Sequence, residues 1–171
     1  MTVGRSPELE ELIAHRQALG LDGFDEVWEG VYRVAPHHHS DHGYLGHELA
    51  FALRDAARTA GLLSYGPFNL GSPTDFRVPD GGLLRELAGT LYVSTASVVV
   101  EIGSPDDETF AKLPFYAAHG VEEVLVVLPE DRRVRCLDLT GGEPVDLDAS
   151  RVLGITMAEL SNNIAWPGIQ A

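Results

Sequence analysis

The chain has 171 residues, 44% of them hydrophobic, and a formal net charge of −14 at pH 7. This length predicts one globular domain over residues 1–171, with roughly two-thirds of the unfolded surface buried. The longest apolar stretches fall short of the roughly 20 residues that cross a bilayer, so a soluble, cytoplasmic protein with no membrane contact is expected. The acidic charge argues against binding of nucleic acid through a general basic face, and a phosphate substrate would need a local exception such as bound divalent cations.

The first third of the chain has the pattern of two helices joined by an extended segment. An amino-terminal helix is expected over residues 6–19, because Ser6 can cap it and Pro7 suits the first helical position. The segment FDEVWEGVYRVAP predicts a turn followed by a short strand at residues 31–34. A second helix is expected over residues 42–60, where leucine and alanine recur on one face and a glycine follows.

The rest of the chain is rich in short strand patterns. A helix between Asp106 and His119 interrupts them, and Pro114 predicts a kink in it or a new helical start near Leu113. A last short helix is expected over residues 156–163, with a capping box at its start. The order of elements predicts an α/β or α+β domain with a mixed sheet flanked by helices, in which VVVEI and EEVLVVL are central strands. The expected strands lie at residues 65–70, 76–84, 97–102, 121–128 and 133–139.

Lys112 is the only lysine of the chain, and two acids precede it at intervals that fit neighbouring strands. Asp80 follows a proline in FRVPDGG, and Glu101 closes the apolar run VVVEI. An ionised carboxylate at the end of a buried strand needs a metal, a cation or hydrogen bonds to compensate its desolvation. Two acids and a lysine suit metal-dependent phosphodiester hydrolysis, in which carboxylates hold Mg²⁺ or Mn²⁺ and the lysine orients or deprotonates water and offsets the phosphate charge.

Each of these three residues also has an ordinary structural interpretation. Asp80 can be a turn residue, because Pro-Asp-Gly-Gly is typical of turns. Glu101 can form a structural ion pair with an arginine such as Arg77. Lys112 can be an exposed lysine on a helix surface. These alternatives stay open on spacing alone.

Three segments carry a resemblance to a known family: FRVPDGGL, VVVEIGSPDDETFAKLPFYAAHGVEEVLVVLPEDRRVRCLDL and APHHHSDHGYLGHELAFAL. They are similar to the Uma-type family of putative restriction endonucleases, which has the PD-(D/E)XK nuclease fold. The resemblance runs over approximately residues 28–166 and implies a restriction-endonuclease-like core there. It further implies that Asp80 and Glu101 are metal ligands, together with the backbone carbonyl of Ile102.

The chain departs from the common E-x-K motif of that superfamily, because Gly103 stands where the lysine is expected. The resemblance to the Uma-type family implies that a lysine in a later K-L-x-x-Y pattern replaces it. That pattern is formed here by Lys112 and Tyr116, which are four residues apart and share one face of a continuous helix.

Two further residues are weaker site candidates. The resemblance places Glu48 on a helix that contributes an acid in many such nucleases, and His42 at the start of that helix. Glu48 can equally be a solvated helix residue, and His42 can make a hydrogen bond at the helix end.

The run His37 to His39, followed by Asp41 and His42, invites a metal-binding interpretation. A solvated loop is favoured, because adjacent histidines in one loop rarely reach one ion together; a structural zinc site remains the alternative. The acids 106–108 are interpreted as helix-start residues that favour the helix dipole, with a possible influence on a nearby metal. Cys136, the single cysteine, is expected in the core.

The sequence therefore predicts a Mg²⁺- or Mn²⁺-dependent DNA endonuclease with Asp80, Glu101 and Lys112 at its centre. A homodimer is expected, since two-fold symmetry matches the two strands of duplex DNA. The alternative is a nuclease-fold module that no longer cleaves and has a binding or regulatory role, as the acidic charge and the missing E-x-K suggest.

Overall fold

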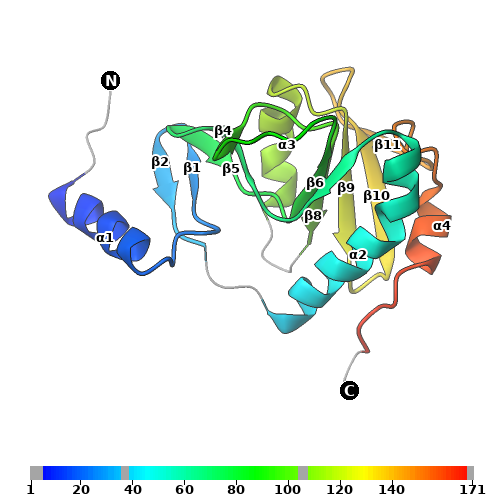
Figure 1. Cartoon of the computed structure of the whole chain (residues 1–171), viewed down its shortest axis with the longest axis horizontal. Helices are drawn as coiled ribbons and strands as arrows, with labels where there is room; N and C mark the ends of the chain where they lie inside the picture. The colour runs from blue at the N-terminus through cyan, green and yellow to red at the C-terminus, as the bar shows by residue number, and fades with distance from the viewer. Residues whose placement is uncertain (1–5, 36–38, 104–107, 169–171) are drawn as a thin grey trace.

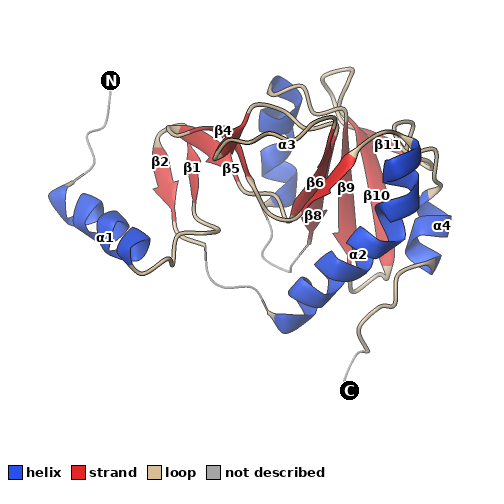
Figure 2. Ribbon diagram, viewed as in Figure 1, coloured by secondary structure: helices blue, strands red, loops and turns tan. Residues whose placement is uncertain are grey.

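The structure is a computed structural model that describes residues 6–35, 39–103 and 108–168. It contains two mixed β-sheets flanked by helices, which confirms the predicted fold class but with two sheets in place of one (Figures 1 and 2). The larger sheet has the order β11 (Val145–Leu147), β10 (Arg133–Asp138), β9 (Glu123–Leu128), β8 (Val98–Ile102), β6 (Gly81–Leu84) and β3 (Leu63–Tyr65). The smaller sheet has the order β2 (Val31–Arg33), β1 (Glu26–Trp28), β5 (Asp75–Arg77), β4 (Asn69–Ser72) and β7 (Tyr92–Val93).

Strands β8 and β9 lie side by side in the middle of the larger sheet and run parallel. Both are almost continuously apolar because both faces of the sheet are covered. Helices α2 (Ser40–Thr59) and α4 (Met157–Asn162) pack on one face, and α3 (Thr109–Ala118) packs on the other. The predicted central strands are therefore confirmed, and Cys136 is buried in the core beside α2 and α4, as expected.

Helices α1 (Pro7–Ala18) and α4 have the predicted amino-terminal caps, whereas α2 begins at Ser40, two residues before the predicted start. Helix α1 is capped by Ser6, which accepts a hydrogen bond from the backbone of Leu9. Thr156 accepts a hydrogen bond from the Glu159 backbone at the start of α4. Helix α3 begins at Thr109 and contains Pro114 within one continuous element, so the suggested new start near Leu113 is wrong. Within the described ranges, no helix is long and apolar enough to cross a membrane.

Two predicted strands are divided in the structure. The expected strand at 65–70 is shared between the end of β3 and the start of β4, and the expected strand at 76–84 separates into β5 and β6. The second break falls around Pro79, which has no N–H to donate to a ladder. The strand before the break, β5, belongs to the smaller sheet, and the strand after it, β6, belongs to the larger sheet. Asp80 therefore lies on the connection between the two sheets.

Strand β1 was missed by the sequence patterns, which gave this segment as a turn. It forms a hairpin with β2 through Glu29 and Gly30, which both have positive φ (49° and 85°). Positive φ at both loop positions is typical of the tightest hairpin turns, but Asn-Gly or Asp-Gly is their usual sequence. Figure 1 shows this hairpin between α1 and the larger sheet.

Asp25 ties α1 to the hairpin. It accepts hydrogen bonds from Arg16 Nε (2.7 Å), the Tyr32 hydroxyl (2.5 Å) and the Ala35 backbone N–H (2.9 Å). Burial alone would raise the pKa of Asp25, but these donors and the Arg16 charge outweigh it and hold the pKa below its ordinary value.

Replacing Asp25 by asparagine is expected to lower the free energy of unfolding at pH 7 by about 2 kcal/mol, because hydrogen bonds to a charged group are lost. A carboxyl with a lowered pKa stabilises the fold above its unfolded pKa of about 3.9, and this contribution is lost as the pH falls through the folded value. The difference between wild type and variant should therefore shrink towards pH 3 in urea denaturation. An equal difference at pH 7 and pH 3 would contradict this assignment.

Candidate active site

Glu101 faces α3 because of the alternation of side chains along β8. Val98, Val100 and Ile102 belong to the core beside α2, whereas Val99 belongs to the core beside α3. Side chains two positions apart share a face of the sheet, so Glu101 lies on the side of Val99. It is only 3% exposed, and its carboxylate accepts a hydrogen bond from the hydroxyl of Tyr116 on α3.

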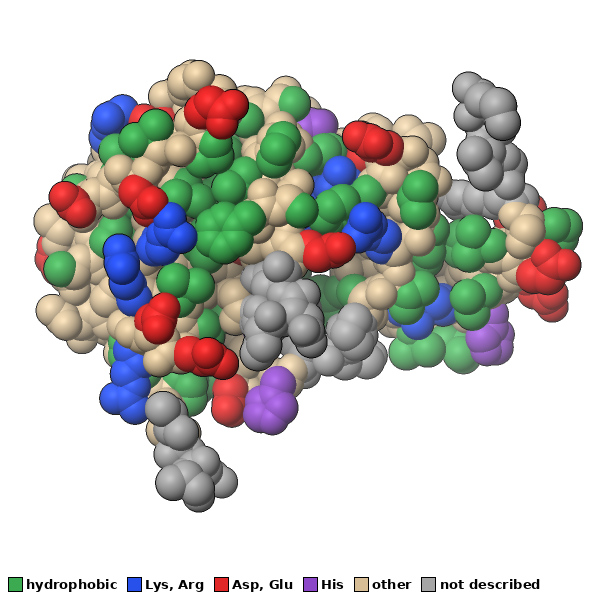
Figure 3. Space-filling view, turned by 180° about the vertical axis from the view of Figure 1, so that it is seen from behind, with side chains coloured by type: hydrophobic (Ala, Val, Ile, Leu, Met, Phe, Trp, Pro, Cys, Tyr) green, Lys and Arg blue, Asp and Glu red, His purple; other side chains and the backbone are tan. Residues whose placement is uncertain are grey.

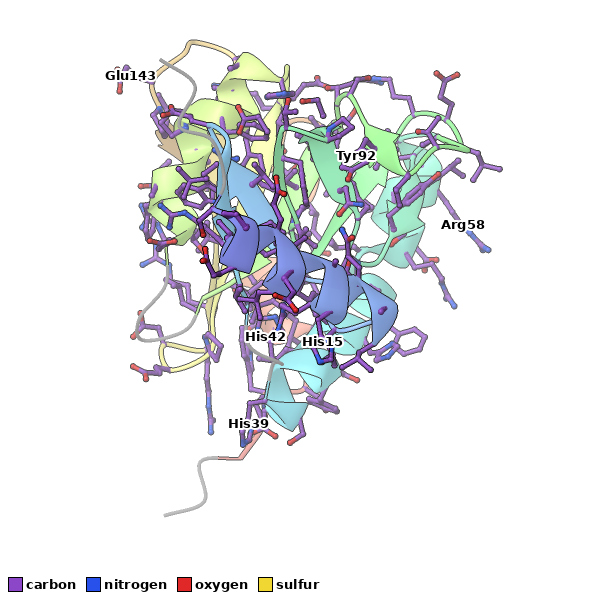
Figure 4. The ribbon with its side chains drawn as sticks, turned by 90° about the vertical axis from the view of Figure 1, so that its left-hand side faces the viewer. His15, His39, His42, Arg58, Tyr92 and Glu143 are labelled. Atoms are coloured by element: carbon purple, nitrogen blue, oxygen red, sulfur yellow. The ribbon has the colours of Figure 1, made fainter. Side chains whose placement is uncertain are left out.

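Asp80 reaches the same end of β8 from the segment between β5 and β6. Its Oδ2 accepts a hydrogen bond of 2.7 Å from the backbone N–H of Ile102. Its Oδ1 lies 2.7 Å from Nε2 of His42, which comes from the first turns of α2. In Figure 4, His39 lies near the tip of α2 and His42 further along it. His42 thus contacts a candidate catalytic acid, and Asp80 is more than a turn residue.

Lys112 extends from α3 into this group of acids. Its Nζ lies 3.3 Å from Oε1 of Glu101 and 3.0 Å from Oε1 of Glu26. The Lys112 side chain is only 13% exposed, so the interpretation as an exposed helical lysine is wrong. Tyr116 lies one turn later on α3 and contacts the same carboxylate, which shows that Pro114 does not separate the two side chains.

Glu26 is a fourth polar residue of this cluster, and the sequence patterns did not identify it. It lies on the missed strand β1 and is 8% exposed. Its Oε1 also accepts a hydrogen bond of 2.8 Å from the backbone N–H of Val78, and its Oε2 accepts one of 2.5 Å from the indole of Trp28. We refer to Glu26, Asp80, Glu101 and Lys112 as the acid–lysine cluster.

The acid–lysine cluster has more carboxyl groups than cations, and this imbalance shifts its ionisation. Burial raises the pKa of Glu101 to about 8; Lys112 opposes this shift, and the charges of Asp80 and Glu26 add to it. Burial alone would lower the pKa of Lys112, but Glu101 and Glu26 outweigh it and raise that pKa above its ordinary value. The pKa of Tyr116 is well above its ordinary value, because of burial and the charge of Glu101. Lys112 and Tyr116 are therefore protonated donors at neutral pH.

An open cavity of about 950 Å³ gives solvent access to the cluster. The four cluster residues and His42 line it. Among the described lining residues there are seven carboxylic acids, and Lys112 is the one lysine or arginine. In Figure 3, acidic and basic side chains are interspersed on the visible face, without a continuous basic stripe. A phosphate in this cavity would need divalent cations to offset the carboxylates.

The donor set fits Mg²⁺ or Mn²⁺. Within the described ranges, no group of three or more His, Cys, Asp or Glu side chains is arranged to hold a metal ion. Magnesium usually keeps several waters and binds through one or two carboxylates, so it needs no closed cage of side chains. Asp80 and Glu101 supply two carboxylates in a cluster with an excess of negative charge, which suits a hard divalent cation.

One weaker site candidate and one suggested ion pair are not found in the cluster. Glu48 accepts a hydrogen bond of 3.1 Å from the backbone of Ala165 and is not among the residues that line the cavity. Its carboxylate therefore holds the carboxy-terminal segment against α2. Arg77 is paired with Asp75 at 2.8 Å, and Glu101 is paired with Lys112, so the suggested Arg77–Glu101 pair does not form.

The histidine run and the acids before α3 are only partly described. His37, His38, Asp106 and Asp107 lie outside the described residues. His39 is the amino-terminal cap of α2 and accepts a hydrogen bond of 3.3 Å from the backbone of Asp41. Glu108 lies at the amino-terminal end of α3, as predicted, but it makes no side-chain capping hydrogen bond there and instead forms an ion pair of 2.5 Å with Arg33.

The fold is similar to that of a solved nuclease-like protein. The crystal structure described as a putative nuclease belonging to DUF820, from Anabaena variabilis, superposes with a TM-score of 0.63. The alignment covers 81% of this chain and 90% of that chain at 15% sequence identity, so the likeness concerns the fold. No curated protein matches the chain.

A family model also matches the sequence. The model is named Uma2, is described as "Putative restriction endonuclease", and matches residues 21–159. This range is well over half of the chain and includes all four residues of the acid–lysine cluster. The resemblance inferred from the sequence is thereby confirmed at the level of the family, and the chain belongs to the Uma2 family.

Proposed function

We propose that this protein is a metal-dependent DNA endonuclease whose centre is formed by Asp80, Glu101 and Lys112. The observation that carries the proposal is the position of the Lys112 ammonium, 3.3 Å from Glu101 in a chain with glycine at the usual lysine position. Lysine from α3 thus supplies the cation that E-x-K would supply from the strand. Family membership and the nuclease-like fold support the same class of activity.

Asp80, Glu101 and the backbone carbonyl of Ile102 would hold Mg²⁺ or Mn²⁺. The ion, when bound, lowers the pKa of a coordinated water and stabilises negative charge on the phosphate oxygens. His42 fixes the orientation of Asp80, and Tyr116 fixes that of Glu101, through the contacts described above. Such contacts behind the ligands keep carboxylates in the geometry that the ion requires.

Lys112 would act on the substrate side of the centre. Its ammonium can donate hydrogen bonds to the attacking water and to a phosphate oxygen, and its charge offsets part of the phosphate charge. Solvent reaches it through the open cavity, which is the route proposed here for the phosphate. A homodimer would bring two such centres to the two strands of a duplex.

The test is cleavage of supercoiled plasmid by purified protein. With Mg²⁺ or Mn²⁺, wild type should produce nicked and linear DNA, and EDTA should prevent this. Asp80→Asn should lower the initial rate by at least about 10²-fold, since a metal ion contributes several kcal/mol to stabilisation of the transition state. Asp55→Asn, at an exposed position of α2, is the control and should cleave like wild type.

Equal background nicking by wild type and Asp80→Asn would contradict the proposal. A non-cleaving module with a binding or regulatory role would then be the better account. Titration with Mn²⁺ separates the two, because an active centre binds the ion with an affinity that collapses in Asp80→Asn.

A further inference from the structure

Glu26 is held more firmly than an incidental neighbour of Lys112 would be. Both of its carboxylate oxygens are engaged: Oε1 by Val78 N–H and Lys112, and Oε2 by the Trp28 indole. These partners come from the segment after β5, from α3 and from β1 itself. Glu26 therefore has a fixed position in which one oxygen is directed at the only lysine of the chain.

Asp25, the acid that precedes Glu26 in the chain, makes a different set of contacts. Asp25 is 2% exposed, and its carboxylate binds Arg16, Tyr32 and the Ala35 backbone. Side chains of consecutive residues in an extended segment point to opposite sides. The two neighbouring buried acids are thus separated: Asp25 anchors α1, and Glu26 enters the cavity. Asp25, which directly precedes β1 and is also buried, therefore provides a control next to Glu26.

We infer that Glu26 is a positioning residue that holds the Lys112 ammonium in place when Glu101 is occupied as a metal ligand. The inference rests on the proposed function. Lys112 has two carboxylate partners, at 3.0 Å and 3.3 Å, and the proposed metal would take up oxygens of the more distant one, Glu101. Glu26 is then the partner that remains, and it is fixed by donors that the metal does not affect.

Two other roles for Glu26 lead to different results. As a third metal ligand it would join Asp80 and Glu101, but no group of three such side chains in the described part of the chain is arranged around one ion. As a purely structural residue it would only link β1 to its surroundings. The first role predicts weaker metal binding on substitution, and the second predicts a loss of stability without a specific effect on Lys112.

The single lysine makes a direct measurement possible. Protein grown with ¹³C,¹⁵N-lysine gives one set of side-chain NMR signals, from Lys112. A lysine side chain that is fixed by its contacts has two resolved Hε signals, whereas a freely rotating side chain has a single averaged signal. Glu26→Gln removes the charge with little change in shape, and Asp25→Asn is the matched control. Each protein is measured in EDTA and in Mg²⁺, and kcat, KM for plasmid DNA and the Mn²⁺ dissociation constant are determined in parallel.

We expect the two Hε signals of Glu26→Gln to merge in Mg²⁺, while wild type and Asp25→Asn keep them resolved. In EDTA the change should be smaller, since Glu101 then still holds the ammonium. The kcat of Glu26→Gln should fall by about 10–100-fold, as for other residues that orient an active group, with KM and Mn²⁺ affinity retained. Trp28→Phe removes the indole donor to Glu26 and keeps an aromatic ring beside Arg33 and Arg77, and it should have the same effect to a smaller extent.

Unchanged Hε signals in Glu26→Gln with Mg²⁺ would overturn the inference. A parallel loss of Mn²⁺ affinity would also overturn it, in favour of a metal ligand, and an equal effect in Asp25→Asn would identify a general loss of structure. If wild type cleaves no DNA, the proposed function fails, and the Lys112 signals alone decide whether Glu26 holds the lysine.

Discussion

Replacing Lys112 by methionine is expected to slow metal-dependent cleavage strongly and to destabilise the fold by about 3–5 kcal/mol at pH 7. Methionine fills a similar volume but leaves the buried carboxylate of Glu26 without its cation, and an uncompensated buried charge is costly. The rate should fall by about 10²–10³-fold, as when one preorganised donor is removed from an active site. Urea denaturation and plasmid cleavage below the melting range measure the two effects separately.

Arg85→Met is the matched control for stability. Arg85 pairs with Glu122 at 2.7 Å, but its side chain is 66% exposed, and such pairs contribute less than about 1 kcal/mol. Lys112→Arg provides a second variant if methionine prevents folding. It should retain most of the stability, because the charge remains, but less of the rate, because a planar guanidinium cannot replace a compact ammonium. Full cleavage by a folded Lys112→Met protein would contradict the role of Lys112.

Replacing Glu101 by glutamine is expected to have opposite effects on stability and activity. Cleavage should fall by about 10³-fold, because the contribution of the metal is lost. In EDTA above pH 8, however, the variant should be more stable than wild type, on the order of 3 kcal/mol, since each unit of pKa shift corresponds to about 1.4 kcal/mol. The buried carboxylate would then be an example of strain retained for function.

The greater stability of Glu101→Gln at high pH follows from the raised pKa of Glu101, which is about 8 in the folded protein against about 4.3 in an unfolded chain. The folded state binds the proton more tightly, so this contribution to stability is fully present below about pH 4 and is lost as the pH rises through 8. Glutamine cannot lose a proton, and the advantage of the variant should therefore grow over this range. A variant that is less stable than wild type at pH 9 would show that the Lys112–Glu101 ion pair outweighs burial.

Much of the centre was predictable because its residues follow strong local patterns. The apolar run before Glu101 predicts a buried central strand, and the side-chain period of two then fixes its face. The spacing of Lys112 and Tyr116 predicts one helical face, and α3 retains it despite Pro114. These relations depend on neighbours in the sequence, so the sequence alone can express them.

The position of Glu26 in the acid–lysine cluster was not predictable in this way. It lies on a three-residue strand whose hairpin turn is Glu-Gly, a weak signal compared with Asn-Gly. Its partner Lys112 is 86 positions away in the chain, and only the packing of α3 beside the smaller sheet brings them together. The sequence signal that could have found it is the alternation of Glu26 with Trp28 in a strand pattern, which would have required the hairpin to be recognised first.

His42 and Glu48 show the same limit within a single helix. Both were candidates on α2, but His42 contacts Asp80, whereas Glu48 contacts Ala165 in the segment that follows α4. The difference is set by which face of α2 meets β8 and which meets the carboxy-terminal segment. Helical spacing separates the two residues, but it does not indicate which of them faces the site.

The most direct test of the proposed centre is a crystal structure of the protein soaked in Mn²⁺, with data collected at the manganese absorption edge. We expect an anomalous peak in contact with the carboxylates of Asp80 and Glu101, with the Lys112 ammonium within hydrogen-bond reach of a water on that ion. No peak at this position at Mn²⁺ concentrations that support cleavage, or a peak only at the histidine run 37–39, would contradict the account.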